Sequence, residues 1–142
     1  MDRIDNFRAL TRDLTRTVGL FGAQLAGTDM TLAEVRVFYE VGQKPWTGRA
    51  LAEHLGLDEG YVSRIVSKLE RAGWVTRAVS DEDRRVRVLT PTPEGATQCA
   101  DMVSWMRDRA GAVLGEVAHI NAAHTDDALG RLRHHLARDD VA

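Results

Sequence analysis

The feature that most constrains this chain is the stretch from Thr47 to Thr92, where two helix signals are followed by two strand signals. The first helix carries an apolar face and ends at Gly56. Asp58 then suits an N-cap, because its carboxylate can accept the free N–H groups of a first helical turn. A second helix follows and ends at Gly73; its apolar face is formed by Val62, Ile65, Val66 and Leu69.

Beyond Gly73 the residue types change to those that favour strands. Strand-forming residues lie on both sides of a polar run, residues 80–85, that reads SDEDRR. Two short strands around a charged tip predict a β-hairpin. Thr92 and Pro93 then suit the N-cap and the first position of another helix.

The ends of the chain show helical periodicity. Residues 2–26 predict one amphipathic helix, residues 93–119 a long one, and Asn121 caps a last helix. Thr31 and Glu34 form a capping box before a helix over residues 32–41. We expect this helix to be the most buried element, with apolar side chains at Leu32, Val35, Val37, Phe38, Tyr39 and Val41.

These signals predict a mainly α fold with a small β-hairpin wing. Residues 1–142 form a single domain in this interpretation, with a winged helix-turn-helix lobe over residues 31–92. Trp46 is expected where the chain enters the stretch from Thr47 to Thr92, in a short third strand against the hairpin. The helix over residues 2–26 has little of its own domain to pack on. Long helices at both ends, residues 2–26 and 93–138, around a compact centre predict a homodimer joined through both ends.

Composition narrows the class of protein. The chain is 44% hydrophobic and 28% charged, which is ordinary for a soluble protein, and it shows no apolar run long enough to span a membrane. The single Cys99 excludes an internal disulfide framework and agrees with a cytoplasmic location.

Charge alone does not indicate a nucleic-acid partner, because the net charge is −2. The 19 cationic side chains include two lysines, Lys44 and Lys68, and are otherwise arginine. Arginine suits bidentate contacts to phosphate and guanine. A GC-rich genome that favours arginine codons would give the same bias.

The strongest family signal is the run LAEHLGLDEGYVSRIVSKLERAGWVTRAVSDEDRRVRVLTPTPEG. With it, the chain resembles the MarR family of transcriptional regulators over nearly its whole length. Asp83, Arg84 and Arg85 fill the D-x-R position of the family's wing, whereas Pro91 stands where the family usually has leucine. The resemblance implies a homodimer that binds a pseudo-palindromic operator in double-stranded DNA. Family members usually repress nearby genes and release DNA when a small, often aromatic, effector binds.

The resemblance makes the helix between Asp58 and Gly73 the recognition helix, which should contact bases in the major groove through residues in its N-terminal half. Arg64 suits guanine, with a discrimination of about 1–3 kcal/mol. A solvated amphipathic face is the alternative. The candidate base-reading residues are Gly60, Tyr61, Ser63, Arg64, Ser67 and Lys68.

At the wing tip, Arg84 and Arg85 are the candidates for minor-groove and phosphate contact. Asp83 would repel phosphate, so we expect it to brace the loop by pairing with Arg77 or Arg85. A hairpin tip that is merely solvated is the alternative.

Helix starts near the motif suit phosphate, which predicts backbone contacts from Thr31, Thr47 and Arg49. Simple capping explains the two threonines equally well.

An effector pocket would lie between the terminal helices and the helix 32–41, and a core role explains its aromatic residues at least as well. Its candidate lining is Phe21, Phe38, Trp46 and Trp105. We expect no cofactor and no metal site, because the histidines at 119, 124, 134 and 135 lack a ligand pattern. Cys99 lies on an apolar helix face, which predicts a buried structural thiol and argues against a redox sensor.

Two rival classes remain to be weighed. A winged helix used only for protein–protein assembly would need an apolar recognition surface or a wing without arginine, and the sequence has neither. An enzyme would need a catalytic motif, and the sequence holds no Gly-rich phosphate loop, HExxH motif or nucleophile elbow.

Overall fold

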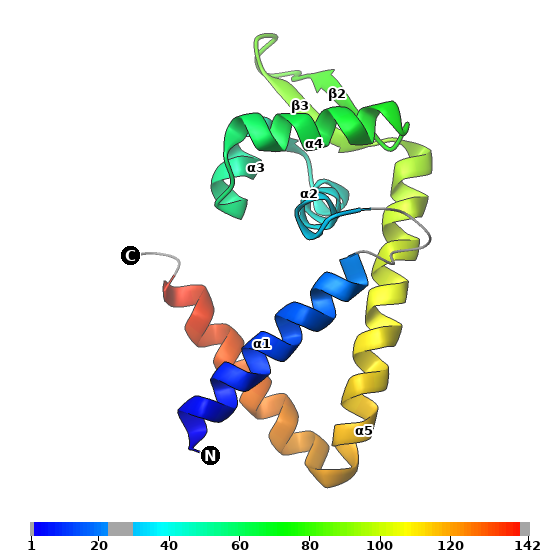
Figure 1. The fold of residues 1–142 in the computed structure, drawn as a ribbon. Coiled ribbons are helices and arrows are strands. Elements are labelled where there is room, and N and C mark those ends of the chain that lie inside the picture. The colour runs from blue at the N-terminus through cyan, green and yellow to red at the C-terminus, as the bar shows by residue number, and fades with distance from the viewer. Residues whose placement is uncertain (1, 23–29, 140–142) are drawn as a thin grey trace. The chain divides into compact units, whose positions relative to one another are not determined.

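The order of the secondary-structure elements follows the order of the sequence signals. The computed structural model describes residues 2–22 and 30–139, with side chains for residues 2–13, 30–108, 110–111 and 123–137. Its elements are α1 (Arg3–Gly22), α2 (Leu32–Gln43), β1 (Trp46–Thr47), α3 (Gly48–Leu55), α4 (Glu59–Arg71), β2 (Val75–Val79), β3 (Arg87–Pro91) and α5 (Pro93–Asp139) (Figure 1). The predicted mainly α fold with a small β wing is confirmed. The chain divides into two compact units, residues 1–105 and residues 106–142.

The core of the first unit forms around α2, which Figure 1 shows nearly end-on beside α3 and α4. Phe38 stacks on Trp74, with ring centroids 5.3 Å apart. The expected burial of this helix is confirmed for one face. It does not extend to Leu32 and Tyr39, which are exposed. The remaining core residues come from every neighbouring element, and include Val35, Val37, Val41, Leu51, Leu55, Val62, Ile65, Val66, Leu69, Val75 and Leu89.

The helices of the lobe begin and end where the capping residues predict. The Thr31 hydroxyl accepts the Glu34 N–H at 3.3 Å, and the Glu34 carboxylate accepts the Thr31 N–H at 3.0 Å, so the capping box is confirmed. Asp58 accepts the Tyr61 N–H at 2.9 Å at the start of α4. Gly56, with a φ of 63°, ends α3 in the left-handed region, where glycine is favoured.

The wing is a three-stranded antiparallel sheet in the order β1-β3-β2. Trp46 and Arg77 pair with Leu89 from opposite sides, so the expected third strand is confirmed and β2 is an edge strand. Pro91 is the last residue of β3, opposite Val75. At that place the missing N–H of proline interrupts no further ladder bond.

A tight junction joins the wing to α4 and α5. Gly73 has a φ of 78°, and its carbonyl accepts the Thr92 hydroxyl at 2.6 Å. The same hydroxyl accepts the Gly95 N–H at 3.0 Å, so Thr92 caps α5 as predicted. A Cβ on Gly95 would collide with the Trp74 carbonyl. Glycine is therefore required at position 95 by close backbone packing.

The predicted boundary between a helix over 93–119 and a last helix capped by Asn121 is wrong. The backbone is helical from Pro93 to Asp139 without interruption. Neither glycine nor proline stands between residues 116 and 129, so a residue suited to capping had no break to cap. At the other end, α1 extends to Gly22, and the predicted continuation over residues 23–26 lies outside the described residues.

Candidate nucleic-acid interface

The N-terminal half of α4 presents a polar, exposed surface. Gly60, Tyr61, Ser63 and Arg64 are exposed, while Val62 on the same turns is buried in the core. The Arg64 guanidinium lies 5.7 Å from the Tyr61 ring, which places a flat cation beside an aromatic face. These four residues thus form a continuous patch that is open to a partner.

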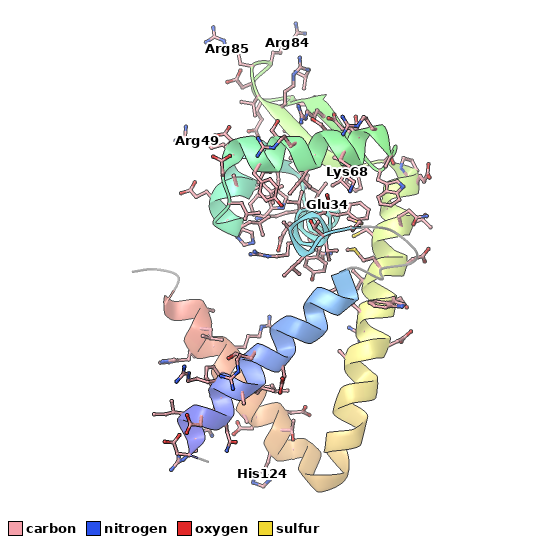
Figure 2. The ribbon with its side chains drawn as sticks, viewed as in Figure 1. Glu34, Arg49, Lys68, Arg84, Arg85 and His124 are labelled. Carbon is pink, nitrogen blue, oxygen red and sulfur yellow. The ribbon has the colours of Figure 1, made fainter. Side chains whose placement is uncertain are left out.

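Lys68, a member of the predicted base-reading set, is engaged by an ion pair within the protein. Its ammonium lies 3.0 Å from both carboxylate oxygens of Glu34 at the start of α2 (Figure 2). The Glu34 side chain is only 13% exposed, against 50% for Lys68. The lysine is therefore drawn toward α2, and sequence periodicity gave no sign of this long-range pair.

Ser67 is also committed to the protein. Its hydroxyl donates to the Ser63 carbonyl at 2.9 Å and accepts from the Arg77 guanidinium at 3.4 Å. Ser67 therefore lies at the border between the exposed patch of α4 and the wing.

The wing tip is shaped by hydrogen bonds within the loop. The Asp83 carboxylate accepts the Arg85 backbone N–H at 2.9 Å, and the Asp83 carbonyl accepts the Val86 N–H at 3.0 Å. Ser80 closes the hairpin by donating its N–H to the Val86 carbonyl at 2.9 Å. Arg84 and Arg85 extend from this tip, away from the helices (Figure 2).

Asp83 thus shapes the tip through the backbone. The predicted ion pair with Arg77 or Arg85 is absent among the described residues, because Arg77 pairs with Glu70, Nε to Oε2 at 3.3 Å. Arg77 lies midway along β2, whereas Asp83 lies in the turn beyond it. A carboxylate on α4 is the group that the Arg77 side chain reaches.

The helix-start candidates divide into caps and one open cation. The Thr47 hydroxyl accepts the Ala50 N–H at 3.2 Å, and Thr31 belongs to the capping box, so both threonines have capping roles. Arg49 is exposed on the first turn of α3, and Figure 2 shows its side chain pointing away from that helix. Phosphate contact by these residues stays a prediction.

The four aromatic residues predicted to line a pocket do not share one environment. Phe38 is in the core against Trp74, and Trp105 packs against the core from α5. Trp46 is half-buried at β1, where its indole N–H donates to the Glu40 carbonyl at 3.0 Å and Lys44 lies over its ring. The side chain of Phe21 lies outside those described.

Cys99 is buried, and desolvation raises the pKa of its thiol, so the predicted structural thiol is confirmed in its burial. In the described part of the chain, no group of three or more metal-ligating side chains comes together; His124 stands exposed on α5 (Figure 2), and the side chain of His119 is not among those described. No described helix is long and apolar enough to cross a membrane.

A capped helix-turn-helix followed by a three-stranded wing defines a winged helix-turn-helix protein. The same fold is found in the structure of Streptococcus pneumoniae FabT in complex with DNA, with a TM-score of 0.80 and 21% identity over 96% of this chain and 99% of that chain. Residues 28–86 match the model of the MarR family.

Two relatives carry names that fit this family. The HTH-type transcriptional regulator BilQ of Clostridium symbiosum is 39% identical over 56 residues, which are 39% of this chain and 39% of that protein. The uncharacterized HTH-type transcriptional regulator YcgE of Bacillus subtilis is 31% identical over 87 residues, which are 61% of this chain and 51% of that protein. The matched stretches therefore span about half or less of these relatives.

Proposed function

We propose that this protein is a sequence-specific, double-stranded DNA-binding regulator of transcription. The observation that carries the proposal is the pairing of two exposed surfaces in one lobe: the α4 patch of Gly60, Tyr61, Ser63 and Arg64, and the arginine-bearing wing tip. A polar helix face of this kind suits base edges in a major groove, and exposed arginines suit the flanking minor groove and phosphates. The DNA complex of the structurally similar FabT supports the same partner.

We propose that the protein acts as a homodimer. Apolar side chains of α1 lie in the open, including Ile4 at 70% exposure, together with Phe7 and Leu10. Within the second unit, Leu129, Leu132 and Leu136 of α5 are exposed as well. Apolar stripes of this kind are costly in water and are expected to be covered by a second copy.

Repression of nearby genes, and release of DNA by a small aromatic effector, are what the resemblance to the MarR family implies. We include both in the proposal, with action in the cytoplasm. The residues of the described chain give no ligand chemistry that would name the effector.

The test is recovery of genomic fragments that the purified protein binds, followed by a salt series on the enriched sequence and on random duplex. We expect a pseudo-palindrome with half-sites about one helical turn apart, and affinity that falls linearly with salt on logarithmic axes. Arg64→Ala should weaken binding to the enriched sequence more than to random duplex. Arg107→Ala, which removes the same charge from an exposed site on α5, is the control. Failure to enrich any sequence, together with affinity independent of salt, would refute the proposal.

A further inference from the structure

We propose that Arg77 is a positioning residue that tethers the wing to the recognition helix, with Glu70 and Ser67 holding it in place. The proposal assigns Arg77 no contact with DNA of its own. It rests on the proposed DNA-binding function for its consequence, and on contacts within the protein for its geometry.

The contacts run along one stripe of α4. The Arg77 guanidinium donates through Nη2 to the Ser63 carbonyl at 3.3 Å and to the Ser67 hydroxyl at 3.4 Å. Its Nε lies 3.3 Å from Glu70 Oε2. Ser63, Ser67 and Glu70 are four and three positions apart, so they share one helix face. Only a guanidinium has a rigid fork that can bond to several groups along such a stripe at once.

Strand geometry explains why Arg77 points toward α4. Side chains two positions apart lie on the same face of a strand, and Val75, two positions before Arg77, is buried in the core. Arg77 therefore projects from the core-facing side of β2. Since β2 leads directly to the tip at Ser80, the tether joins α4 to the strand that carries Arg84 and Arg85.

The guanidinium of Arg77 is paired with groups of the protein itself, although the side chain is partly exposed. Its side chain is 34% exposed, and that of its partner Glu70 is 31% exposed. Ser67 donates its only hydroxyl proton to the Ser63 carbonyl. Both Ser67 and Arg77 are thus part of the frame that sets the distance from the base-reading patch to the wing tip.

The sharpest test is Glu70→Ala, because simple electrostatics and the tether predict opposite changes in the affinity for DNA. Removal of a carboxylate near DNA should tighten binding, as expected for the control Glu82→Ala, which removes an exposed carboxylate from the wing tip. If Glu70 holds the tether, Glu70→Ala should instead weaken binding to the enriched sequence by about fivefold, the scale of one partly exposed charged hydrogen bond. Tighter binding by Glu70→Ala would overturn the proposal.

A double-mutant cycle separates positioning from direct contact. Arg77→Ala should weaken binding, and Arg85→Ala should then cost less in that background than in the wild type, because the wing is already displaced. Arg77→Lys keeps the charge without the fork and should not restore affinity. Additive losses, or rescue by lysine, would assign Arg77 to the phosphates and overturn the proposal.

A measurement without DNA keeps this inference separate from the proposed function. Amide hydrogen exchange over residues 76–90 should be faster in Arg77→Ala and Glu70→Ala than in wild type or Glu82→Ala, while exchange in the α4 core stays unchanged. Unchanged exchange in the wing would overturn the tether. Faster exchange in a protein that binds no DNA would refute the proposed function and leave the tether intact.

Discussion

The pair formed by Glu34 and Lys68 makes a quantitative prediction about DNA binding. Both carboxylate oxygens of Glu34 lie 3.0 Å from the Lys68 ammonium, and the same carboxylate completes the capping box with Thr31. Glu34→Gln separates these roles, because glutamine also serves in a capping box while it lacks the charge. The substitution should therefore release Lys68 and keep the start of α2 intact.

The expected magnitude follows from counterion release. In the proposed homodimer each protomer releases one Lys68, and two additional phosphate contacts steepen the slope of log affinity against log salt by about 1.8. Between 50 and 200 mM salt, that change corresponds to an extra loss of affinity of about 12-fold in Glu34→Gln relative to wild type. The stability cost should be small, about 0.2–1 kcal/mol, because the Lys68 side chain is 50% exposed.

The assay is fluorescence anisotropy with a labelled duplex over this salt range, for wild type, Glu34→Gln, Lys68→Met and the double variant. The steeper slope should appear in Glu34→Gln alone and vanish in the double variant. Lys68→Met by itself should leave the slope unchanged. A slope that falls by about 1.8 in Lys68→Met would show that Lys68 of each protomer reaches phosphate despite Glu34, and would refute the reasoning.

Three further predictions concern the wing, the junction and the buried thiol. Arg85→Ala should weaken operator binding about tenfold with the protein still folded, and a change within about twofold at fixed salt would show the wing assignment to be wrong. Gly95→Ala should destabilise the protein by about 1–3 kcal/mol in urea unfolding, because its Cβ meets the Trp74 carbonyl. Gly111→Ala, where a Cβ meets nothing within 4 Å on α5, should be neutral or stabilising; equal losses in both variants would contradict the packing argument. Burial raises the pKa of the Cys99 thiol above its ordinary 9.0, so the folded state favours the neutral form. Its contribution to stability should be complete below pH 9.0 and be lost as the pH rises through the folded pKa, and Ellman's reagent should react rapidly only after unfolding.

Local signals in the sequence predict most of the lobe. Thr31, Asp58 and Thr92 cap helices because a short polar side chain reaches the free N–H groups a few residues ahead, and such contacts depend on local spacing alone. Gly56 and Gly73 end helices with positive φ for an equally local reason. The hairpin follows from the change in residue types between Gly73 and Thr92.

The periodicity of the sequence could not predict polar contacts between residues that are far apart in the chain. Glu34 and Lys68 are separated by 34 positions, and whether they meet depends on how α2 packs against α4. The sequence offered Arg77 a partner at the wing tip, but its position midway along β2 places its side chain against Glu70 of α4. The predicted end of the helix that begins at Pro93 was wrong for a different reason. Asn121 can cap a new helix only where the preceding helix ends, and α5 continues through that position.

These pairings change what the charge of the lobe can do. Lys68 and Arg77 are held by Glu34 and Glu70, whereas Arg49, Arg64, Arg84 and Arg85 form no ion pair among the described residues. Four phosphate-directed arginines would give a salt slope of about −3.6 per protomer, and inclusion of Lys68 and Arg77 would make it about −5.4. A protein with a net charge of −2 gains little from bulk attraction to DNA. In the proposed DNA complex, affinity then depends on where these few arginines are placed, and base contacts from the α4 patch give the specificity. The proposed Arg77 tether sets the distance between that patch and the wing tip.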